Sequence, residues 1–217
     1  MPEFSIDKNE VLRYAGHKGI IPDNLDNIAQ QVIRQCMETL TPRHTVRRAR
    51  VTQTYNGVVL DDTLLLQGKD IKKHLDGCDE CYILCATVGV GADSFIRTMQ
   101  VTGSVYGLLA DAAGSAAIEA YCDMIETNLR NDMKEEGKYL TWRYSPGYGD
   151  FPFTQQPEIL DFLQAAKLTG VTCNESSIML PAKSVTAVMG IAAHKPRDRQ
   201  GKCATCPNRN NCNFSCR

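Results

Sequence analysis

The sequence has almost no net charge and no long hydrophobic run. Its formal net charge is −1 over 217 residues, so its composition gives no sign of the basic surface that nucleic-acid-binding proteins carry. No apolar stretch reaches the length needed to span a bilayer. Residues 1–13 are charged and interrupted, without the apolar region of a signal peptide. We therefore expect a cytoplasmic protein with no nucleic-acid or membrane partner, in a compartment where thiols stay reduced.

Cysteine, by contrast, is abundant. There are ten cysteines, and most fall in two clusters, a pattern that favours metal binding over disulfides in a reduced protein. The first cluster is Cys78, Cys81 and Cys85. Cys81 and Cys85 share one face of a predicted strand with Ile83, and small buried cysteines are common in cores. The sequence therefore favours core thiols here, with metal ligands as the alternative.

The second cluster forms the C-terminal tail, with the spacing C-x2-C-x5-C-x3-C and too few apolar residues to build a core. Such a segment has little reason to fold without a metal. Four thiolates fit either zinc or an iron–sulfur cluster. The compact spacing and the proline after the second cysteine favour the cluster, and a disordered, reduced tail is the remaining alternative. The predicted ligands are Cys203, Cys206, Cys212 and Cys216.

The rest of the chain mixes helical and strand patterns. Helical spacing of apolar residues covers most of residues 7–40 and 104–136, and β-branched or alternating runs occur at 45–54, 58–67, 82–88 and 184–193. This order predicts an α+β fold, a twisted and mainly antiparallel sheet with packed helices, plus the short Cys-rich tail. We divide the chain into an N-terminal helical segment (1–42), an α+β domain (43–194), and a linker with the metal-binding tail (195–217).

One short stretch, residues 141–152, concentrates turn-forming and ligand-binding residue types. Ser145-Pro146-Gly147-Tyr148 predicts a type II turn, because Pro146 presets φ and Gly147 permits a positive φ. Such a turn aims backbone N–H groups into one spot, and Arg143 enters it from a predicted strand. A guanidinium and an aromatic ring suit a ligand with a carboxylate and a flat or cationic part. A rigid loop with an ion-paired arginine is the simpler interpretation.

Glu119 lies among the small residues that fill the first half of the long predicted helix, whereas the second half is heavily charged and is predicted to be solvated. An acid in a small-residue zone should be paired, hydrated or functional.

Two segments resemble the activation domain of cobalamin-dependent methionine synthase. Residues 143–148 match that family's R-x-x-x-G-Y signature, and residues 175–186 are similar to its E-S-x-x-M-x-P-x-x-S-V-S segment. Their order and spacing also fit, and residues 117–123 look like the helix that carries an acid in that family. The earlier half looks like the short, stand-alone members. The resemblance covers most of the chain but not the cysteine tail.

In that family the domain binds S-adenosylmethionine beside a cobalamin held by another module, and supports reductive methylation of cob(II)alamin. The resemblance implies that Arg143 holds the ligand's carboxylate and Glu119 a polar or cationic part, and it implies no catalytic side chain. Met189 stands where the resemblance leads us to expect a ligand-contacting tyrosine. The implied binding residues are Glu119, Arg143, Ser145, Pro146, Gly147 and Tyr148.

The cobalamin-binding signature D-x-H-x-x-G is missing, since His17 lies in A-G-H-K-G. We therefore expect a partner, a cobalamin-binding methionine synthase or another corrinoid protein, to supply the cobalamin, with a possible electron donor besides. The first hypothesis is a stand-alone reactivation component, contributing to methyl transfer. The alternative is a redox or regulatory partner of a corrinoid protein that uses the metal tail without methyl transfer.

Overall fold

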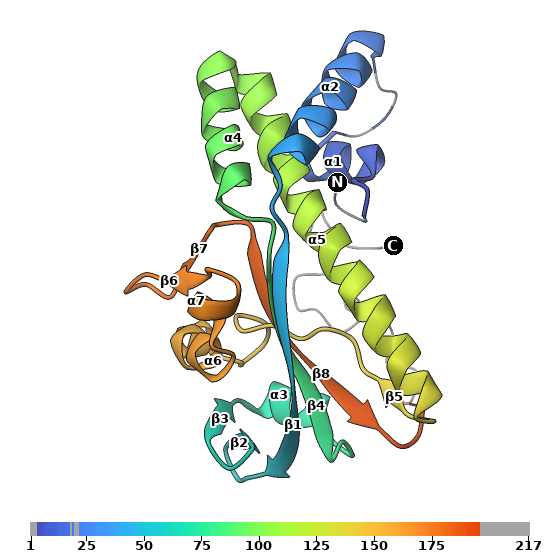
Figure 1. The fold of residues 1–217 in the computed structure, drawn as a ribbon, viewed down its shortest axis with the longest axis vertical. Coiled ribbons are helices and arrows are strands. Elements are labelled where there is room, and N and C mark those ends of the chain that lie inside the picture. Colours follow the sequence, from blue (N-terminus) through green and yellow to red (C-terminus); the bar gives the residue numbers. More distant parts are fainter. Residues whose placement is uncertain (1–3, 18, 20–21, 196–217) are drawn as a thin grey trace.

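The computed structural model describes residues 4–17, 19 and 22–195, and shows a six-stranded sheet with helices packed on both faces (Figure 1). The strand order is β3-β2-β1-β4-β8-β5, and every neighbouring pair is antiparallel. The predicted α+β fold is confirmed. The cysteine tail lies outside the described residues.

The longer strands and helices fall close to the predicted positions, whereas the two-residue strands at 139–140, 172–173 and 179–180 were not predicted. The sheet strands are β1 (Arg43–Gln53), β2 (Gly57–Leu60), β3 (Leu64–Gln67), β4 (Glu80–Thr87), β5 (Tyr139–Leu140) and β8 (Ser184–Ala192), and a separate two-stranded ribbon pairs β6 (Thr172–Cys173) with β7 (Met179–Leu180). The helices are α1 (Lys8–Tyr14), α2 (Asp23–Thr39), α3 (Lys69–His74), α4 (Val90–Thr102), α5 (Ser104–Glu135), α6 (Gln156–Phe162) and α7 (Ala165–Leu168), with a 3₁₀ turn at Phe153–Gln155.

Strand β4 has a hydrophobic core on each of its faces, which explains its nearly continuous apolar sequence. Leu84 and Ala86 pack in the core made with α1, α2, α4 and α5. Ile83 and Cys85 point the other way, into the core made with β2, β3, α3 and α6. Cys78, Cys81 and Cys85 are all buried, as predicted for core thiols. Within the described part of the chain, no group of three or more His, Cys, Asp or Glu residues is arranged to hold a metal.

Helix α5 runs along much of the length of the molecule (Figure 1). It begins after Gly103 and ends at Glu135, close to the prediction. Its first half packs small residues against α4 and α2, and α1 and α2 share this core with the sheet. Its second half continues past the sheet towards β5, with which it is in contact. That second half carries the acids described below.

Side chains close both edges of the sheet. At the β3 edge, Gln155 Oε1 accepts a hydrogen bond from the Gln67 N–H (2.7 Å), and its Nε2 donates to the Leu65 carbonyl (2.7 Å). At the β5 edge, the Arg130 guanidinium donates to the carbonyls of Leu140 and Thr141. These bonds occupy backbone groups that an edge strand would otherwise present to solvent.

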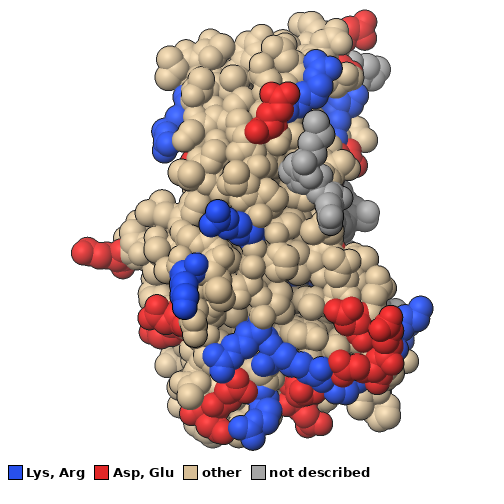
Figure 2. Space-filling model, in the orientation of Figure 1, with Lys and Arg blue, Asp and Glu red and all other residues tan. Residues whose placement is uncertain are grey.

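Charged residues gather at the end of the molecule that holds β2, β3 and α3, where positive and negative side chains lie next to each other (Figure 2). Strand β1 carries four arginines, and three of them, Arg47, Arg48 and Arg50, are ion-paired. Arg47 contacts Asp61 (2.8 Å) and Arg50 contacts Asp62 (3.3 Å). Arg48 contacts both Glu80 and Glu136 (2.7 and 2.9 Å). Because nearby acids pair with these partly exposed arginines, this face of β1 is a solvated, charge-balanced surface.

Glu80 gives a prediction about acid stability. Hydrogen bonds from Arg48 and then Lys138 lower the pKa of Glu80 from 4.5 to about 2. Since the folded-state pKa is depressed, the stabilisation by Glu80 is present above the unfolded pKa and is lost as pH falls towards 2. We expect Glu80→Gln to lose less stability than the wild type between about pH 4.5 and 2, in urea unfolding at several pH values. The effect should be modest and salt-sensitive, because the ion pairs of Glu80 are partly exposed. Parallel stability–pH profiles for Glu80→Gln and the wild type would contradict this prediction.

Candidate functional site

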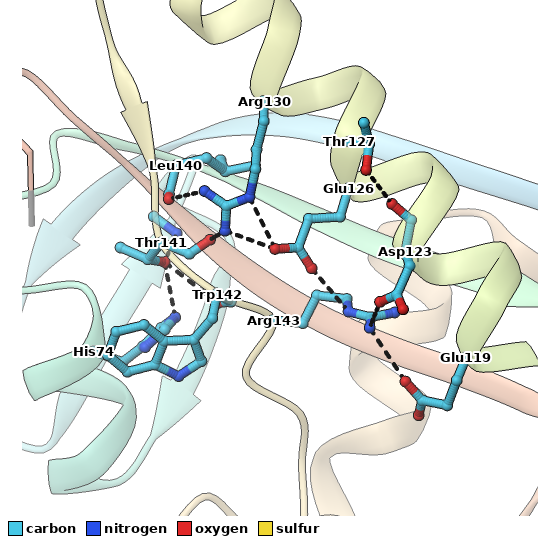
Figure 3. Close-up of polar contacts among 11 residues, drawn as sticks. His74, Glu119, Asp123, Glu126, Thr127, Arg130, Leu140, Thr141, Trp142 and Arg143 are labelled. Atoms are coloured by element: carbon cyan, nitrogen blue, oxygen red, sulfur yellow. Dashed lines mark hydrogen bonds and ion pairs between the residues drawn. The ribbon is translucent and has the colours of Figure 1, made fainter. Parts of the chain in front are cut away.

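Three acids on one face of α5 converge on Arg143 (Figure 3). Glu119, Asp123 and Glu126 are spaced by four and then three residues, a spacing that aligns side chains along one face of a helix. Glu119 lies 3.2 Å from Nη2 of Arg143 and Glu126 lies 3.1 Å from its Nε, while Asp123 also contacts Nη2. The structure therefore brings together Arg143 and Glu119, two of the predicted ligand-binding residues. It adds two acids that the sequence placed on a solvated surface.

Arg143 is buried, and its guanidinium is not fully satisfied. The side chain is only 5% exposed. Burial lowers the pKa of Arg143, and Glu119 acts in the opposite direction; an arginine nevertheless stays charged. Among the described residues, no hydrogen-bond partner lies at its Nη1. A buried donor left without an acceptor is costly, and more so when it is charged. Nη1 is therefore the place where the protein lacks an acceptor.

A bulge turns Arg143 away from the sheet, contrary to the strand predicted there. The Thr141 N–H donates to the Gly190 carbonyl (2.9 Å), and Tyr144 exchanges both backbone hydrogen bonds with Val188 (3.0 and 2.9 Å). Two residues, 142 and 143, thus stand opposite the single residue Met189. An extra residue in one strand bends it and redirects its side chains. Met189 itself is fully buried in the core on the α5 side of the sheet.

The predicted turn is present. The Tyr148 N–H donates to the Ser145 carbonyl (3.2 Å), and Gly147 has φ +94°, the positive φ that a type II turn requires at its third residue. The backbone N–H groups of the turn are not available to a ligand as predicted, because the Gly147 N–H also donates within the protein, to the Phe151 carbonyl (2.8 Å). Among the described residues, no hydrogen bond reaches the carbonyls of Pro146 and Gly147. The turn thus presents acceptors rather than donors.

Tyr148 completes the arrangement. Its ring is exposed, it lies near Tyr144 with the ring centroids 6.1 Å apart, and it is close enough to Arg143 to raise the pKa of that guanidinium. Within the turn, Ser145 is half-buried and Pro146 is buried. The predicted metal ligands Cys203, Cys206, Cys212 and Cys216 lie outside the described residues.

A second arginine, Arg130, holds one of the three acids, Glu126, in place. Arg130 contacts Glu126 (2.6 Å) one helical turn away, while its guanidinium holds the backbone at Leu140 and Thr141. Glu126 thus lies between two guanidinium groups, Arg130 and Arg143 (Figure 3). Sequence reasoning missed Asp123, Glu126 and Arg130. The spacing from Glu119 along one helical face is the signal that would have found the acids.

The comparison with protein families decides the classification. The family model for the activation domain of vitamin B12-dependent methionine synthase matches residues 6–199. The chain belongs to this family. The match spans the sheet, α5 and the turn, and so includes every described residue of the site. The family resemblance in the sequence is confirmed.

The fold of this activation-domain protein also resembles a solved structure. A crystal structure described as the MetH reactivation domain bound to AdoHcy matches with a TM-score of 0.64 at 17% sequence identity, covering 88% of this chain and 75% of that one. At this identity the likeness concerns the fold. No curated protein sequence matches the chain. None of the helices in the described residues is long and apolar enough to cross a membrane.

Proposed function

We propose that this activation-domain protein binds S-adenosylmethionine at Arg143 and, as a stand-alone component, supports reductive methylation of a cob(II)alamin held by a separate protein. The partner would be a cobalamin-binding methionine synthase or another corrinoid protein. The observation that carries the proposal is the buried Nη1 of Arg143, which lacks an acceptor among the described residues. A ligand carboxylate would supply that acceptor in a charge-assisted hydrogen bond.

The surroundings of Arg143 suit the rest of this ligand. Three carboxylates face one guanidinium, so the site carries excess negative charge that favours the ligand's ammonium and sulfonium groups. The carbonyls of Pro146 and Gly147 suit an amino group, and the exposed ring of Tyr148 suits a flat or cationic part. The solved relative is described as bound to AdoHcy, which shares the carboxylate, the ammonium group and the flat adenine ring with S-adenosylmethionine but has an uncharged thioether in place of the sulfonium.

In this proposal the ligand supplies the methyl group and the protein supplies placement. Arg143, Glu119 and the turn bind and orient the ligand, and no side chain of this chain is assigned a chemical step. Isothermal titration of the purified protein with S-adenosylmethionine tests the proposal. Saturable binding at one site supports the proposal. It would be overturned if the titration gave no binding heat and AdoHcy did not compete for the site.

The cobalamin is expected to come from the partner. Because the sequence has no D-x-H-x-x-G signature, we predict that the isolated protein does not retain added cobalamin through gel filtration. The measurement is the visible absorption of the protein peak after incubation with hydroxocobalamin, with free cobalamin as the reference. A stoichiometric corrinoid spectrum on the protein peak would show that this chain holds its own cobalamin.

The tail carries a separate prediction, because its cysteines lie outside the described residues. We expect Cys203, Cys206, Cys212 and Cys216 to bind one metal centre, an iron–sulfur cluster rather than zinc. Such a cluster could pass an electron to the cobalt, whereas zinc has no redox chemistry. Iron and sulfide analysis after anaerobic purification measures this, with Cys203→Ala expected to lose both. Zinc alone would remove the redox role, and four metal-free titratable thiols would refute the site.

The same analysis addresses the alternative function. Iron and sulfide in a protein that fails to bind S-adenosylmethionine would favour a redox or regulatory partner of a corrinoid protein without methyl transfer. Binding of S-adenosylmethionine favours the reactivation component whatever metal the tail contains.

A further inference from the structure

A reciprocal clasp joins the end of the turn to the start of α3. The Asp150 carboxylate accepts hydrogen bonds from the backbone N–H groups of Lys69 and Asp70 (both 2.8 Å). In return, Oδ2 of Asp70 accepts a hydrogen bond from the Asp150 N–H (3.2 Å). Asp150 thus satisfies two N–H groups in the first turn of a helix, groups that have no partner inside the helix itself. The two segments are 80 residues apart in the sequence.

Two glycines allow the segments to come this close. A Cβ on Gly149 would collide with Asp70 Oδ2 and would lie 2.7 Å from Tyr144 Oη. Gly149 also has φ +55°, in the left-handed region. A Cβ on Gly68, which precedes α3, would lie 2.8 Å from Asp150 Oδ1. Side chains at either position would push the clasp open, so its geometry depends on both glycines.

The clasp and the bulge hold the turn from its two ends. At the start of the turn, the bulge at residues 142 and 143 is followed by the bridge of Tyr144 to Val188. At its end, Asp150 holds the chain two residues after Tyr148. Between them, Tyr144 Oη donates to the Tyr148 carbonyl (3.2 Å). Among the described residues, Asp150 forms its hydrogen bonds with Lys69 and Asp70 at the start of α3, and not with Arg143 or its acids. Its influence on the site must therefore pass through the turn.

We propose that Asp150 is a positioning residue for ligand binding, which anchors the turn of residues 145–148 to α3 without touching the ligand. The inference rests on the proposed function, since it concerns the same site. The backbone hydrogen bonds from Asp70 and Lys69 also lower the pKa of Asp150, so the clasp is made by a charged carboxylate at neutral pH.

The test compares Asp150→Ala and Asp150→Asn with a matched control, Asp61→Asn. Asp61 also accepts a backbone hydrogen bond, from the Arg50 N–H (2.9 Å), and likewise has a lowered pKa, but it fastens the β1–β2 hairpin. Hydrogen exchange of the peptide covering residues 143–152 reports on the clasp without any ligand. Titration with S-adenosylmethionine reports on the site.

We expect amide exchange in residues 143–152 to become about tenfold faster in Asp150→Ala, and the Kd for S-adenosylmethionine to rise about tenfold, the scale of one lost charged hydrogen bond. Asp150→Asn keeps one acceptor oxygen and should show smaller changes in both. Asp61→Asn should leave both at the wild-type values. Unchanged exchange in Asp150→Ala would overturn the clasp, and unchanged affinity despite faster exchange would overturn its role in binding.

A double-mutant cycle with Tyr148→Ala separates positioning from general destabilisation. If Asp150 acts through the placement of Tyr148, the loss of affinity caused by Asp150→Ala should shrink in the Tyr148→Ala background. Additive losses would contradict action through that ring. If the wild type binds no S-adenosylmethionine, the proposed function and the binding role both fall, and the exchange experiment still decides whether Asp150 holds the turn.

Discussion

Replacing Arg143 by alanine should weaken S-adenosylmethionine binding by roughly 1.5–3 kcal/mol, the usual contribution of a hydrogen bond to a charged group. The ligand's carboxylate would lose its bond to the guanidinium, and three acids would face that carboxylate without the Arg143 cation between them. Arg143→Lys should recover only part of the affinity, because an ammonium keeps the charge but not the planar fork. Isothermal titration at fixed salt measures both variants.

The Arg143→Ala variant is expected to fold. Glu119 and Asp123 are 44% and 70% exposed and can turn to solvent, and Glu126 keeps its ion pair with Arg130. Arg48→Ala is the control, since it also removes an arginine that contacts more than one acid, but its partners are Glu80 and Glu136 rather than the three acids of the site. Equal affinity in the Arg143→Ala variant and the wild type, at unchanged circular dichroism, would remove Arg143 from the binding site.

Phe151→Ala should lower the free energy of unfolding by about 3–5 kcal/mol, the range for removing a buried phenylalanine from a core. The Phe151 ring is 1% exposed and stacks on Tyr144 with an interplanar angle of 4° and 6.2 Å between ring centroids. Its truncation leaves a cavity beneath the turn, next to the residues that pack around α6. Equilibrium unfolding in urea measures the loss.

Phe153→Ala is the control for this effect. It removes the same side chain two residues later, where the ring is 42% exposed, so its cost should stay near the ~1 kcal/mol typical of point substitutions. Similar losses in the two variants would mean that Phe151 does not anchor the turn to the core. A midpoint shift with an unchanged denaturant slope would show that stability alone had changed.

The regular elements were largely predictable because their patterns are local. The β-branched run of β1, the apolar run of β4 and the small residues of α5 each indicate their structure within a short window. The turn followed from two adjacent residues, Pro146 and Gly147, whose φ preferences are intrinsic. Burial on both faces of β4 also explains why Cys81 and Cys85 are core thiols.

The site was predictable only in part, because its geometry depends on contacts between distant segments. Arg143 and Glu119 were singled out by their residue types and sequence surroundings, the family resemblance implied which parts of the ligand they hold, and the structure pairs them. Asp123 and Glu126 look like an ordinary charged helix surface until the bulge directs Arg143 towards them. A bulge is set by the register between two strands, and no local pattern around Trp142 encodes it. The clasp of Asp150 with α3 is equally non-local.

The side chain of Gln155 has a consequence for how this protein behaves at high concentration. Its amide takes the place of a neighbouring peptide group along β3, so a second copy of the chain finds these two hydrogen-bonding positions already filled. Arg130 does the same at the opposite end, where β5 is only two residues long. The sheet is therefore poorly suited to grow by strand addition. Both edges of the sheet are in this way protected from pairing with a second copy of the chain.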